Sequence, residues 1–476
     1  MLTEHDVTRA LDEVAQMKRF HERWIMDGAL RERLAAAPAE ASARGGLSVS
    51  LEELRAFRYT PDAPEALLAP PEPAATPLPP RVQRFQAFQQ EKHARATLLR
   101  SRCTPRDPRM AAWRERQIAR CTAELGTSKN ALLMHTLVAF ELTRGCSAGC
   151  WFCAIGARPL SGIAPYDEPT RALWRGMLEV IHEVLGDGAR HGFCYWATDP
   201  LDNPDYERFS LDFAELLGTF PQTTTALMLK DPRRTRALLA LSARHGCEGN
   251  RFSILSLKQL ERVHAEFSPG ELLHVDLIPM NRESGMEKVN AGHARTRALP
   301  GHRIAPEAFA STIACVSGFL FNLVERTVRL VTPCNASKRW PLGYWVLAEA
   351  RFSEPGELRQ ILREMIDRRM KTHLTLEDPF TLRPGVSWSR DERGHSLKTP
   401  WLISRLPGGA MLDELEPLVS SGRLSAGELA DALWERRHVP LANTLFLLNQ
   451  LFLTGLFEQE PEPRPAPPPV SREGRT

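Results

Sequence analysis

The chain has 476 residues with 61 basic and 58 acidic side chains, so its formal net charge is only +3 and neither nucleic acid nor an anionic membrane is expected as the main partner. Hydrophobic residues make up 43% of the sequence, and no segment of roughly 20 apolar residues could span a bilayer, so we expect a soluble, cytoplasmic protein of several domains. The nine cysteines are an odd number and only three are grouped, which favours thiols used as ligands or reagents over a disulfide framework.

The first 84 residues divide into a helical module, residues 1–60, and a linker, residues 61–84. In the module, apolar side chains recur at roughly helical spacing, as Val7, Leu11, Val14, Phe20, Trp24 and Leu34. A shorter helix is expected at 51–57. The linker and the tail at 459–476 are rich in proline. Proline cannot donate the hydrogen bonds of helices and sheets, so the sequence predicts an extended linker and a disordered tail.

Residues 85–350 begin with a helical extension and then alternate between apolar, strand-like runs and amphipathic helices. The expected strands are 135–143, 192–198, 223–230, 251–257, 272–280 and 327–333. The expected helices between them are 170–184, 206–217, 233–244, 259–266 and 306–324. Six strand-helix units in succession predict an α/β protein whose parallel sheet forms a partial (β/α)6 barrel. Catalytic groups in such barrels lie at the carboxyl ends of the strands.

The last third of the chain starts with a connecting helix in residues 351–383. Residues 386–390 and 400–406 are expected to form a hairpin, because the turn-prone segment 391–394 lies between them. Three helices are expected at 412–419, 426–434 and 441–453, and Ser425 and Glu428 have the spacing of a capping box at the start of the second. Two strands followed by three short helices predict a winged helix-turn-helix domain over residues 384–458.

The grouped cysteines, Cys146, Cys150 and Cys153, directly follow the first expected strand. Their spacing, CxxxCxxC, lets three thiolates bind three irons of one [4Fe-4S] cluster. Because no fourth cysteine is nearby, one iron would remain open to an exogenous chelate such as the amino and carboxylate groups of S-adenosylmethionine (SAM). The alternatives are three ordinary buried thiols or a zinc site on Cys150 and Cys153, which would need a further ligand pair that the sequence lacks.

This cysteine motif resembles that of the radical SAM superfamily, with Phe152 at the aromatic position next to the cofactor. The second expected strand ends in Ala197-Thr198-Asp199-Pro200, where the superfamily has the GGEP segment that binds the SAM amino group. The resemblance implies that Asp199 contacts SAM, and the alternative is a simple strand-to-helix turn. Ser256, at the end of the fourth expected strand, is similar to serines that contact the SAM carboxylate or ribose. The alternative interpretation of Ser256 is a loop residue whose hydroxyl is solvated and contacts no cofactor.

Five segments together resemble the radical SAM epimerases that mature ribosomal peptides, the proteusin-type enzymes; they are 140–155, 195–206, 250–257, 290–295 and 331–344. In that family a 5′-deoxyadenosyl radical removes the Cα hydrogen of an L-residue in a precursor peptide. A cysteine thiol then returns hydrogen from the opposite face. The resemblance implies peptide epimerisation with SAM and one [4Fe-4S] cluster as cofactors, and with an external electron donor such as flavodoxin or ferredoxin.

The thiol that returns hydrogen is assigned to Cys334, which follows the sixth expected strand and should therefore face the cluster. The alternative is that Cys334 stands there by chance. Cys315, on the expected helix at 306–324, is the second choice, although a buried thiol on a helix usually serves packing.

The flanking regions fit a peptide substrate. Residues 384–458 resemble the winged-helix recognition element typified by the peptide chaperone of PQQ synthesis, which binds a leader peptide as an added strand. Residues 5–57 resemble the helical leader of Nif-type precursors. The alternatives are a packing domain and a helical accessory module. Two other functions stay open: a radical SAM enzyme that forms thioethers or C–C bonds or adds methyl groups, and a non-catalytic peptide-binding iron-sulfur scaffold.

Overall fold

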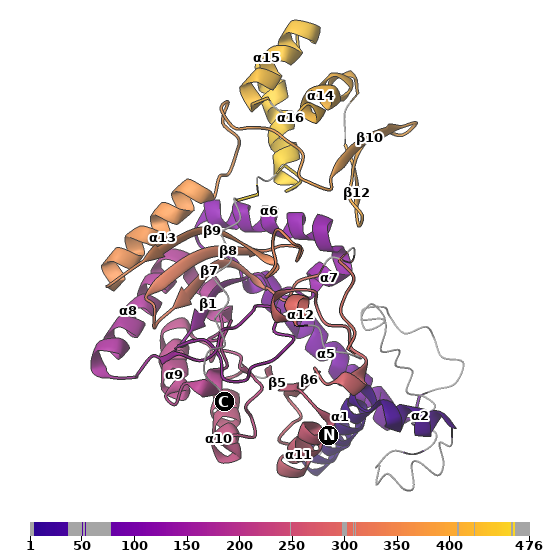
Figure 1. Cartoon of the computed structure of the whole chain (residues 1–476), viewed down its shortest axis with the longest axis vertical. Coiled ribbons are helices and arrows are strands. Elements are labelled where there is room, and N and C mark those ends of the chain that lie inside the picture. The colour runs from indigo at the N-terminus through magenta and orange to yellow at the C-terminus, as the bar shows by residue number, and fades with distance from the viewer. Residues whose placement is uncertain are drawn as a thin grey trace.

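The chain is a mixed α/β protein (Figure 1). The computed structural model describes residues 4–36, 50, 53, 78–247, 249–297, 302–307, 309, 311–406, 409–422, 424–457 and 460–461. The helix expected at 51–57, the linker and the proline-rich tail lie largely outside these described residues.

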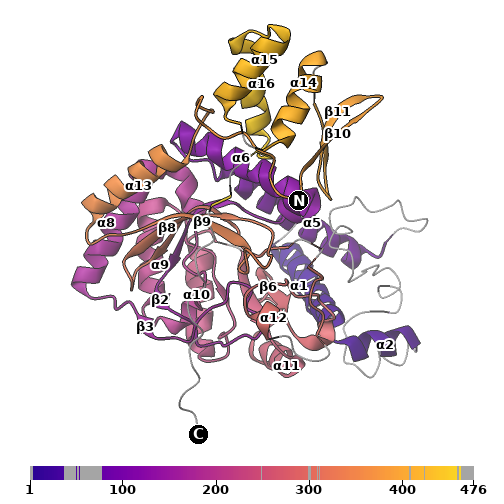
Figure 2. The ribbon, with the colours of Figure 1, turned by 45° about the horizontal axis from the view of Figure 1, so that its top comes forward.

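The first sheet contains β1 (Thr136–Glu141), β7 (Val316–Asn322), β8 (Thr327–Pro333) and β9 (Tyr344–Arg351), in the order β1-β7-β8-β9. β1 and β7 are parallel, and the pairs β7–β8 and β8–β9 are antiparallel. Two helices pack on one face of this sheet, α8 (Glu168–Leu185) and α13 (Pro355–Arg369) (Figure 2). The expected connecting helix of residues 351–383 thus contains α13, which belongs to the main core.

β7 and β8 correct two expectations. Residues 306–324, expected as a helix, contain the strand β7, and residues 327–333, expected as a sixth parallel strand, form β8 antiparallel to it. All seven residues of β7 are buried, so the strand has no alternation of apolar and polar residues that would distinguish it from a buried helix. The short connection from Asn322 to Thr327 permits a hairpin, whereas parallel strands need a long crossover.

The second sheet is parallel and contains β4 (Thr224–Thr225), β5 (Asn250–Ile254) and β6 (Val275–Pro279). Its strands alternate with α9 (Tyr206–Leu217), α10 (Pro232–Arg244) and α11 (Leu257–Glu266), as the sequence predicts. Residues 192–198, expected as a strand, form only the bridge between Ala139 and Phe193. The closure of these strands into a partial barrel stays a prediction.

The N-terminal helices pack against the second sheet. They are α1 (Glu4–Met26), α2 (Gly28–Ala36) and α5 (Pro80–Arg102), and the expected domain boundary after residue 84 lies inside α5. The Lys18 ammonium of α1 donates a hydrogen bond of 2.7 Å to the carbonyl of Val275 in β6, and Met26 lies in the core formed by β5, β6 and α11. Residues 4–36 therefore complete the core of the second sheet.

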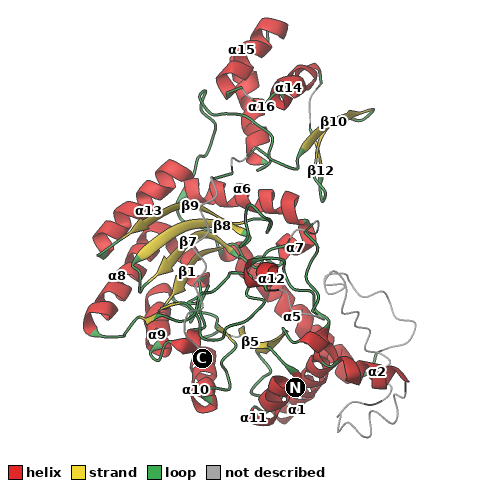
Figure 3. Cartoon of the chain, in the orientation of Figure 1, coloured by secondary structure: helices red, strands yellow, loops and turns green. Residues whose placement is uncertain are grey.

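The C-terminal region has three antiparallel strands and three helices (Figure 3). The strands are β10 (Ser387–Asp391), β11 (Gly394–Lys398) and β12 (Ile403–Arg405), and the helices are α14 (Ala410–Ser420), α15 (Ala426–Arg437) and α16 (Leu441–Leu453). The partner of β10 is β11, a polar strand that the sequence analysis missed. The predicted capping box of Ser425 and Glu428 is confirmed. The assignment as a winged helix-turn-helix stays a prediction.

The other helices and strands are short or flank the first sheet. They are α6 (Pro108–Leu125), α7 (Thr127–Ala131), β2 (Thr143–Arg144), β3 (Gly162–Ile163) and α12 (Gly292–Thr296). No helix within the described part of the chain is both long and apolar enough to cross a membrane.

Candidate functional site

The three grouped cysteines lie on a loop, residues 144–163, that leaves the carboxyl end of β1. The short antiparallel pair β2–β3 closes the base of this cysteine loop. Gly145 has a φ of +87°, and a Cβ there would lie 2.2 Å from the carbonyl oxygen of Pro159. Only glycine fits this close approach. It lets the N–H of Cys146 donate to the carbonyl of Arg158 at 2.8 Å.

All three thiols are free and only partly exposed. Burial raises the pKa of Cys146 to about 12, and the carboxyl groups of Asp199 and Asp202 act in the same direction. Burial also raises the pKa of Cys150 to about 11, with Cys153 as the next cause. Among the described residues, no group of three His, Cys, Asp or Glu side chains is arranged as metal ligands. The residue types still fit an iron-sulfur cluster, because three cysteines that form no disulfide lie on one short loop and thiolates are the ligands that such a cluster requires.

Asp202, which the sequence analysis missed, fixes the start of the cysteine loop. Its carboxylate accepts hydrogen bonds from the backbone N–H of Ser147 at 2.8 Å and from the Ser147 hydroxyl. Asp202 is 5% exposed and belongs to a 3-10 turn, residues 200–202. A carboxylate 55 residues further along the chain thus orients the residue next to Cys146.

The predicted SAM contact Asp199 lies close to the cysteine loop, but its carboxyl oxygens already accept three hydrogen bonds. The donors are the Thr225 hydroxyl at 2.7 Å and the backbone N–H groups of Ala226 at 2.7 Å and Leu201 at 3.0 Å. Burial raises the pKa of Asp199 to about 6. The side chain therefore ties the end of the 192–198 segment to β4.

The helix α12 packs directly on the cysteine loop. The backbone N–H of His293 donates to the carbonyl of Cys153 at 2.9 Å, and His293 Nδ1 lies 3.3 Å from the carbonyl of Cys150. Gly292 has a φ of +52°, and a Cβ there would lie 2.4 Å from the Cys153 carbonyl oxygen. This contact gives a physical reason for the glycine and histidine in the 290–295 segment.

Phe152 and Ser256, the other two residues predicted to contact SAM, each have a neighbour within the chain. The ring of Phe152 lies 5.7 Å from the ammonium of Lys288, a buried residue that the sequence analysis missed. The hydroxyl of Ser256 accepts the backbone N–H of Gln259 at 3.1 Å, so Ser256 is the N-cap of α11. Its side chain therefore has a structural task, and its predicted contact with SAM stays a prediction.

Cys334 lies at the opposite end of the first sheet from the cysteine loop, which corrects the expectation that it faces the cluster. Glu141, at the carboxyl end of β1, pairs with Asn322 of β7, and Asn322 pairs with Thr327 of β8. β8 therefore starts beside the cysteine loop and ends, just before Cys334, beside the start of β1. The six residues of β1 separate the two places by roughly 15–20 Å.

Cys334 instead belongs to the junction with the C-terminal elements. It is 2% exposed, packs with Trp340 and Trp345, and lines a cavity of about 370 Å³ that α6 and the C-terminal region enclose. Burial raises the pKa of its thiol. The guanidinium of Arg120 lies 4.0 Å from the centre of the Trp345 ring in the same wall.

Cys315 precedes β7 directly and is not on a helix. Its carbonyl accepts the backbone N–H of Thr136 at 2.9 Å. The side chain packs against a cluster of buried residues that Tyr195, Trp196 and Tyr344 also cover, and this cluster is separate from the core under α8 and α13. Cys315 therefore belongs to the face of the sheet turned away from those helices. Burial raises the pKa of its thiol to about 11.

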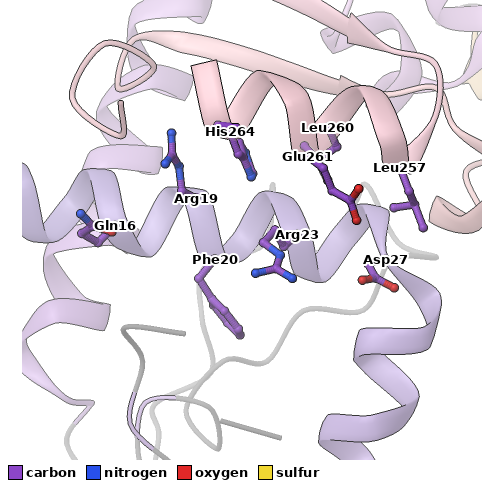
Figure 4. A pocket seen from close by; sticks show the side chains of 10 residues that line it. Gln16, Arg19, Phe20, Arg23, Asp27, Leu257, Leu260, Glu261 and His264 are labelled. Carbon is purple, nitrogen blue, oxygen red and sulfur yellow. The ribbon is translucent and has the colours of Figure 1, made fainter. Parts of the chain in front are cut away.

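A second cavity, of about 360 Å³, lies between α1 and α11. Figure 4 shows side chains from both helices lining it, among them Arg23 of α1 and Glu261 of α11, together with Asp27, which follows α1. None of the predicted site residues lines this groove.

The comparison with curated proteins gives one relative over nearly the whole chain. The uncharacterized protein y4wI of Sinorhizobium fredii (strain NBRC 101917 / NGR234) is 36% identical over 462 residues, which are 95% of this chain and 88% of that protein. No protein-family model matches. The crystal structure of BtrN in complex with AdoMet and 2-DOIA covers 40% of this chain and 71% of that chain, with 12% identity and a TM-score of 0.28. This TM-score is too low to show a common fold.

Proposed function

We propose that the family of the uncharacterized protein y4wI, to which this chain belongs, is a family of radical SAM enzymes. The observation that carries the proposal is the position of Cys146, Cys150 and Cys153 on one loop at the carboxyl end of β1. Loops at the carboxyl ends of strands are where α/β enzymes place their chemistry. The three thiolates are the proposed ligands of one [4Fe-4S] cluster.

The residues around the loop have the positioning roles that such a site needs. A bound [4Fe-4S] cluster, given an electron by a donor such as flavodoxin or ferredoxin, supplies the reductive cleavage of SAM to a 5′-deoxyadenosyl radical. Asp202 holds the loop at Ser147, and His293 holds the carbonyls of Cys150 and Cys153. These contacts fix the loop before any ligand binds, so less conformational entropy is lost on binding.

The specific reaction that we propose is epimerisation of residues in a precursor peptide, with Cys315 as the hydrogen donor. Cys315 packs among aromatic side chains on the face of the first sheet turned away from α8 and α13. Its raised pKa, about 11, keeps the thiol protonated at neutral pH, and an S–H bond is what a hydrogen-atom donor requires. Cys315 and Cys334 both lie near the start of β1. Cys334 packs with Trp340 and Trp345 at the junction with the C-terminal region, whereas Cys315 belongs to the cluster that includes Tyr195 and Trp196.

The C-terminal region is the proposed binding site for the leader of that peptide. β10 and β12 are the edge strands of a three-stranded sheet, and within the described residues neither pairs with a strand on its outer side, which is where a leader peptide could be added. The β12 edge includes Ile403, whose side chain is 60% exposed. Another peptide modification, such as thioether or C–C bond formation or methylation, is the alternative for the same fold and cofactors.

Anaerobic reconstitution tests the radical SAM assignment. We expect one [4Fe-4S] cluster per chain and formation of 5′-deoxyadenosine from SAM after reduction with dithionite. Replacing Cys146, Cys150 and Cys153 together with alanine should abolish both, whereas Cys247→Ala, a half-buried cysteine outside the loop, should keep both. A cluster that survives in the triple variant would refute the ligand assignment. A cluster without SAM cleavage would favour the non-catalytic scaffold.

A further inference from the structure

Lys288 is a buried cation that has no counter-charge within the described part of the chain. Its residue is 4% exposed, and among the described residues no carboxylate forms an ion pair with it. Among the described residues, its ammonium donates one hydrogen bond, to the carbonyl oxygen of Pro279 at 3.3 Å. Burial lowers its pKa to about 8, so the side chain is still mostly protonated at pH 7. An ammonium has three N–H donors, and the described residues accept one of them.

The surroundings of Lys288 place this charge between the second sheet and the cysteine loop. Pro279 is the last residue of β6, and the ring of Phe152, between the second and third cysteines, lies 5.7 Å from the ammonium. The backbone of Lys288 is fixed on both sides, because its N–H donates to the carbonyl of Arg303 at 2.8 Å and its carbonyl accepts the N–H of Ala305 at 2.9 Å. The position of the ammonium is therefore set by the fold.

Taking an ammonium out of water is costly unless an anion or several hydrogen bonds compensate. One carbonyl at 3.3 Å compensates only part of that cost. Such an arrangement is expected where the missing anion arrives with a ligand, since the charge-assisted hydrogen bond then forms in a dry site and is strong.

We propose that Lys288 binds the carboxylate of a molecule that occupies the space beside the cysteine loop. This inference rests on the proposed function, under which two molecules bring a carboxylate there: SAM, through its methionine part, and an acidic or C-terminal residue of the substrate. Of these two carboxylates we favour that of SAM. Lys288 lies next to Phe152, and Phe152 belongs to the cysteine loop that is proposed to bind the cluster and SAM. Lys288 would then be a positioning residue that fixes the methionine part of SAM.

The first test compares SAM with its decarboxylated analogue, S-adenosyl-3-methylthiopropylamine, in equilibrium dialysis against the anaerobically reconstituted protein. Lys288→Met keeps the length of the side chain and removes the charge. We expect it to weaken SAM binding by about 10- to 100-fold and to leave the affinity for the decarboxylated analogue unchanged. Lys288→Arg should recover part of the loss. Lys258→Met, at an exposed lysine of α11, is the matched control and should bind both molecules as the wild type does.

The second test uses acetate as a free carboxylate and follows thermal unfolding. Acetate should raise the unfolding temperature of the wild type above that in equal chloride, and Lys288→Met should lose this difference. If saturating SAM removes the acetate effect, the carboxylate of SAM occupies Lys288. If the effect persists in the presence of SAM, a substrate carboxylate is the ligand.

Three results would overturn the inference, and they can be told apart. Unchanged SAM affinity together with an unchanged acetate effect in Lys288→Met would show that Lys288 binds no carboxylate. A ligand-free Lys288→Met variant that unfolds well below the wild type would show that the contact with Pro279 is structural. Wild-type protein with a cluster but no SAM binding would refute the proposed function, and this inference with it.

Discussion

At the scale of single residues, Asp202 gives a direct test of how the cysteine loop is held. Asp202→Ala leaves the N–H and hydroxyl of Ser147 without their acceptor, at a cost of about 1–3 kcal/mol. We expect the variant to fold but to lose iron to a chelator about ten times faster than the wild type. Asp187→Ala, at an exposed acid in the 3-10 helix Gly186–His191 that follows α8, is the control. Equal rates of iron loss in the two variants would show that the loop does not depend on Asp202.

The buried Asp199 predicts a pH effect of defined sign. Its pKa is about 6 in the folded chain against an ordinary value of 3.8, so between these values the folded state holds a proton that the unfolded state has lost. Stability therefore falls as pH rises from 3.8 to 6 and carries the full penalty above 6. Asparagine cannot ionise. Asp199→Asn should accordingly become more stable relative to the wild type as pH increases from 4.5 to about 7, measured as the difference in unfolding temperature.

The contacts of Asp202 and Lys288 could not be predicted from the sequence, whereas the place of the three cysteines on a loop after the first strand could. The cysteines are recognisable because all three ligands lie within eight residues, and their spacing alone carries the chemistry. Asp202 acts on a residue 55 positions away, and Lys288 meets Phe152 across an even longer separation. Only the folded chain brings such pairs together.

At the scale of secondary-structure elements, the two candidate hydrogen donors lie at the same end of the first sheet, where β1 starts, and they differ in the side chains that surround them. Cys334 packs with Trp340 and Trp345 at the junction with the C-terminal region, whereas Cys315 lies on the face of the sheet that carries Tyr195 and Tyr344. We expect Cys315→Ala to reduce D-residue formation in a co-expressed precursor peptide to background while SAM cleavage continues. Cys334→Ala should retain most of the epimerisation. Chiral amino-acid analysis and a deuterated-water label measure both.

The reverse result, loss of epimerisation in Cys334→Ala alone, would contradict the proposed donor. Retention of full activity in both variants would remove the thiol donor from the proposed mechanism, and the other peptide modifications would then be preferred.

The contact between α1 and the second sheet predicts a large stability effect. Lys18 is 7% exposed, forms an ion pair with Glu22, and donates to the carbonyl of Val275. Lys18→Met should destabilise the chain by about 3–5 kcal/mol, because it leaves the Glu22 carboxylate buried beside His264 only. Lys18→Met combined with Glu22→Leu removes both charges and should recover more than half of the loss. Thermal unfolding measures all three proteins, and a double variant no more stable than the single one would argue against the ion pair.

The elements that the sequence predicts best are amphipathic helices with marked ends. The expected bounds of α9 and α16 agree with the structure, and α15 starts at its capping box. β7 was missed because every one of its residues is buried, so neither a helical nor a strand period is visible. β11 was missed for the opposite reason, since its residues Gly394–Lys398 are mostly polar and the strand is stabilised by two neighbours.

At the scale of the whole molecule, Arg383 joins the C-terminal region to the rest of the chain. It is 7% exposed, donates to the carboxylate of Glu124 in α6, and lies 4.8 Å from the centre of the Trp345 ring. Arg383→Met should loosen this junction by about 2 kcal/mol, the usual value for a charged hydrogen bond. We expect limited proteolysis to cut the connection after α13 about ten times faster, while Arg393→Met, at the exposed turn between β10 and β11, should leave the rate unchanged. Equal rates for the two variants would show that other contacts hold the region.

The pairing of β1 with β7 also has a consequence for biosynthesis. β7 lies about 180 residues after β1, and it is the hydrogen-bonded neighbour of β1 in the first sheet. At a translation rate of about 5–20 residues per second, the edge of β1 waits roughly 10–40 s on the ribosome for this partner. During that time the cysteine loop and all six residues of β1, which the fold buries and of which Leu137–Phe140 are apolar, are exposed. Yield in a heterologous host should therefore depend on chaperones that shield the nascent chain, and slower growth at low temperature should not replace them.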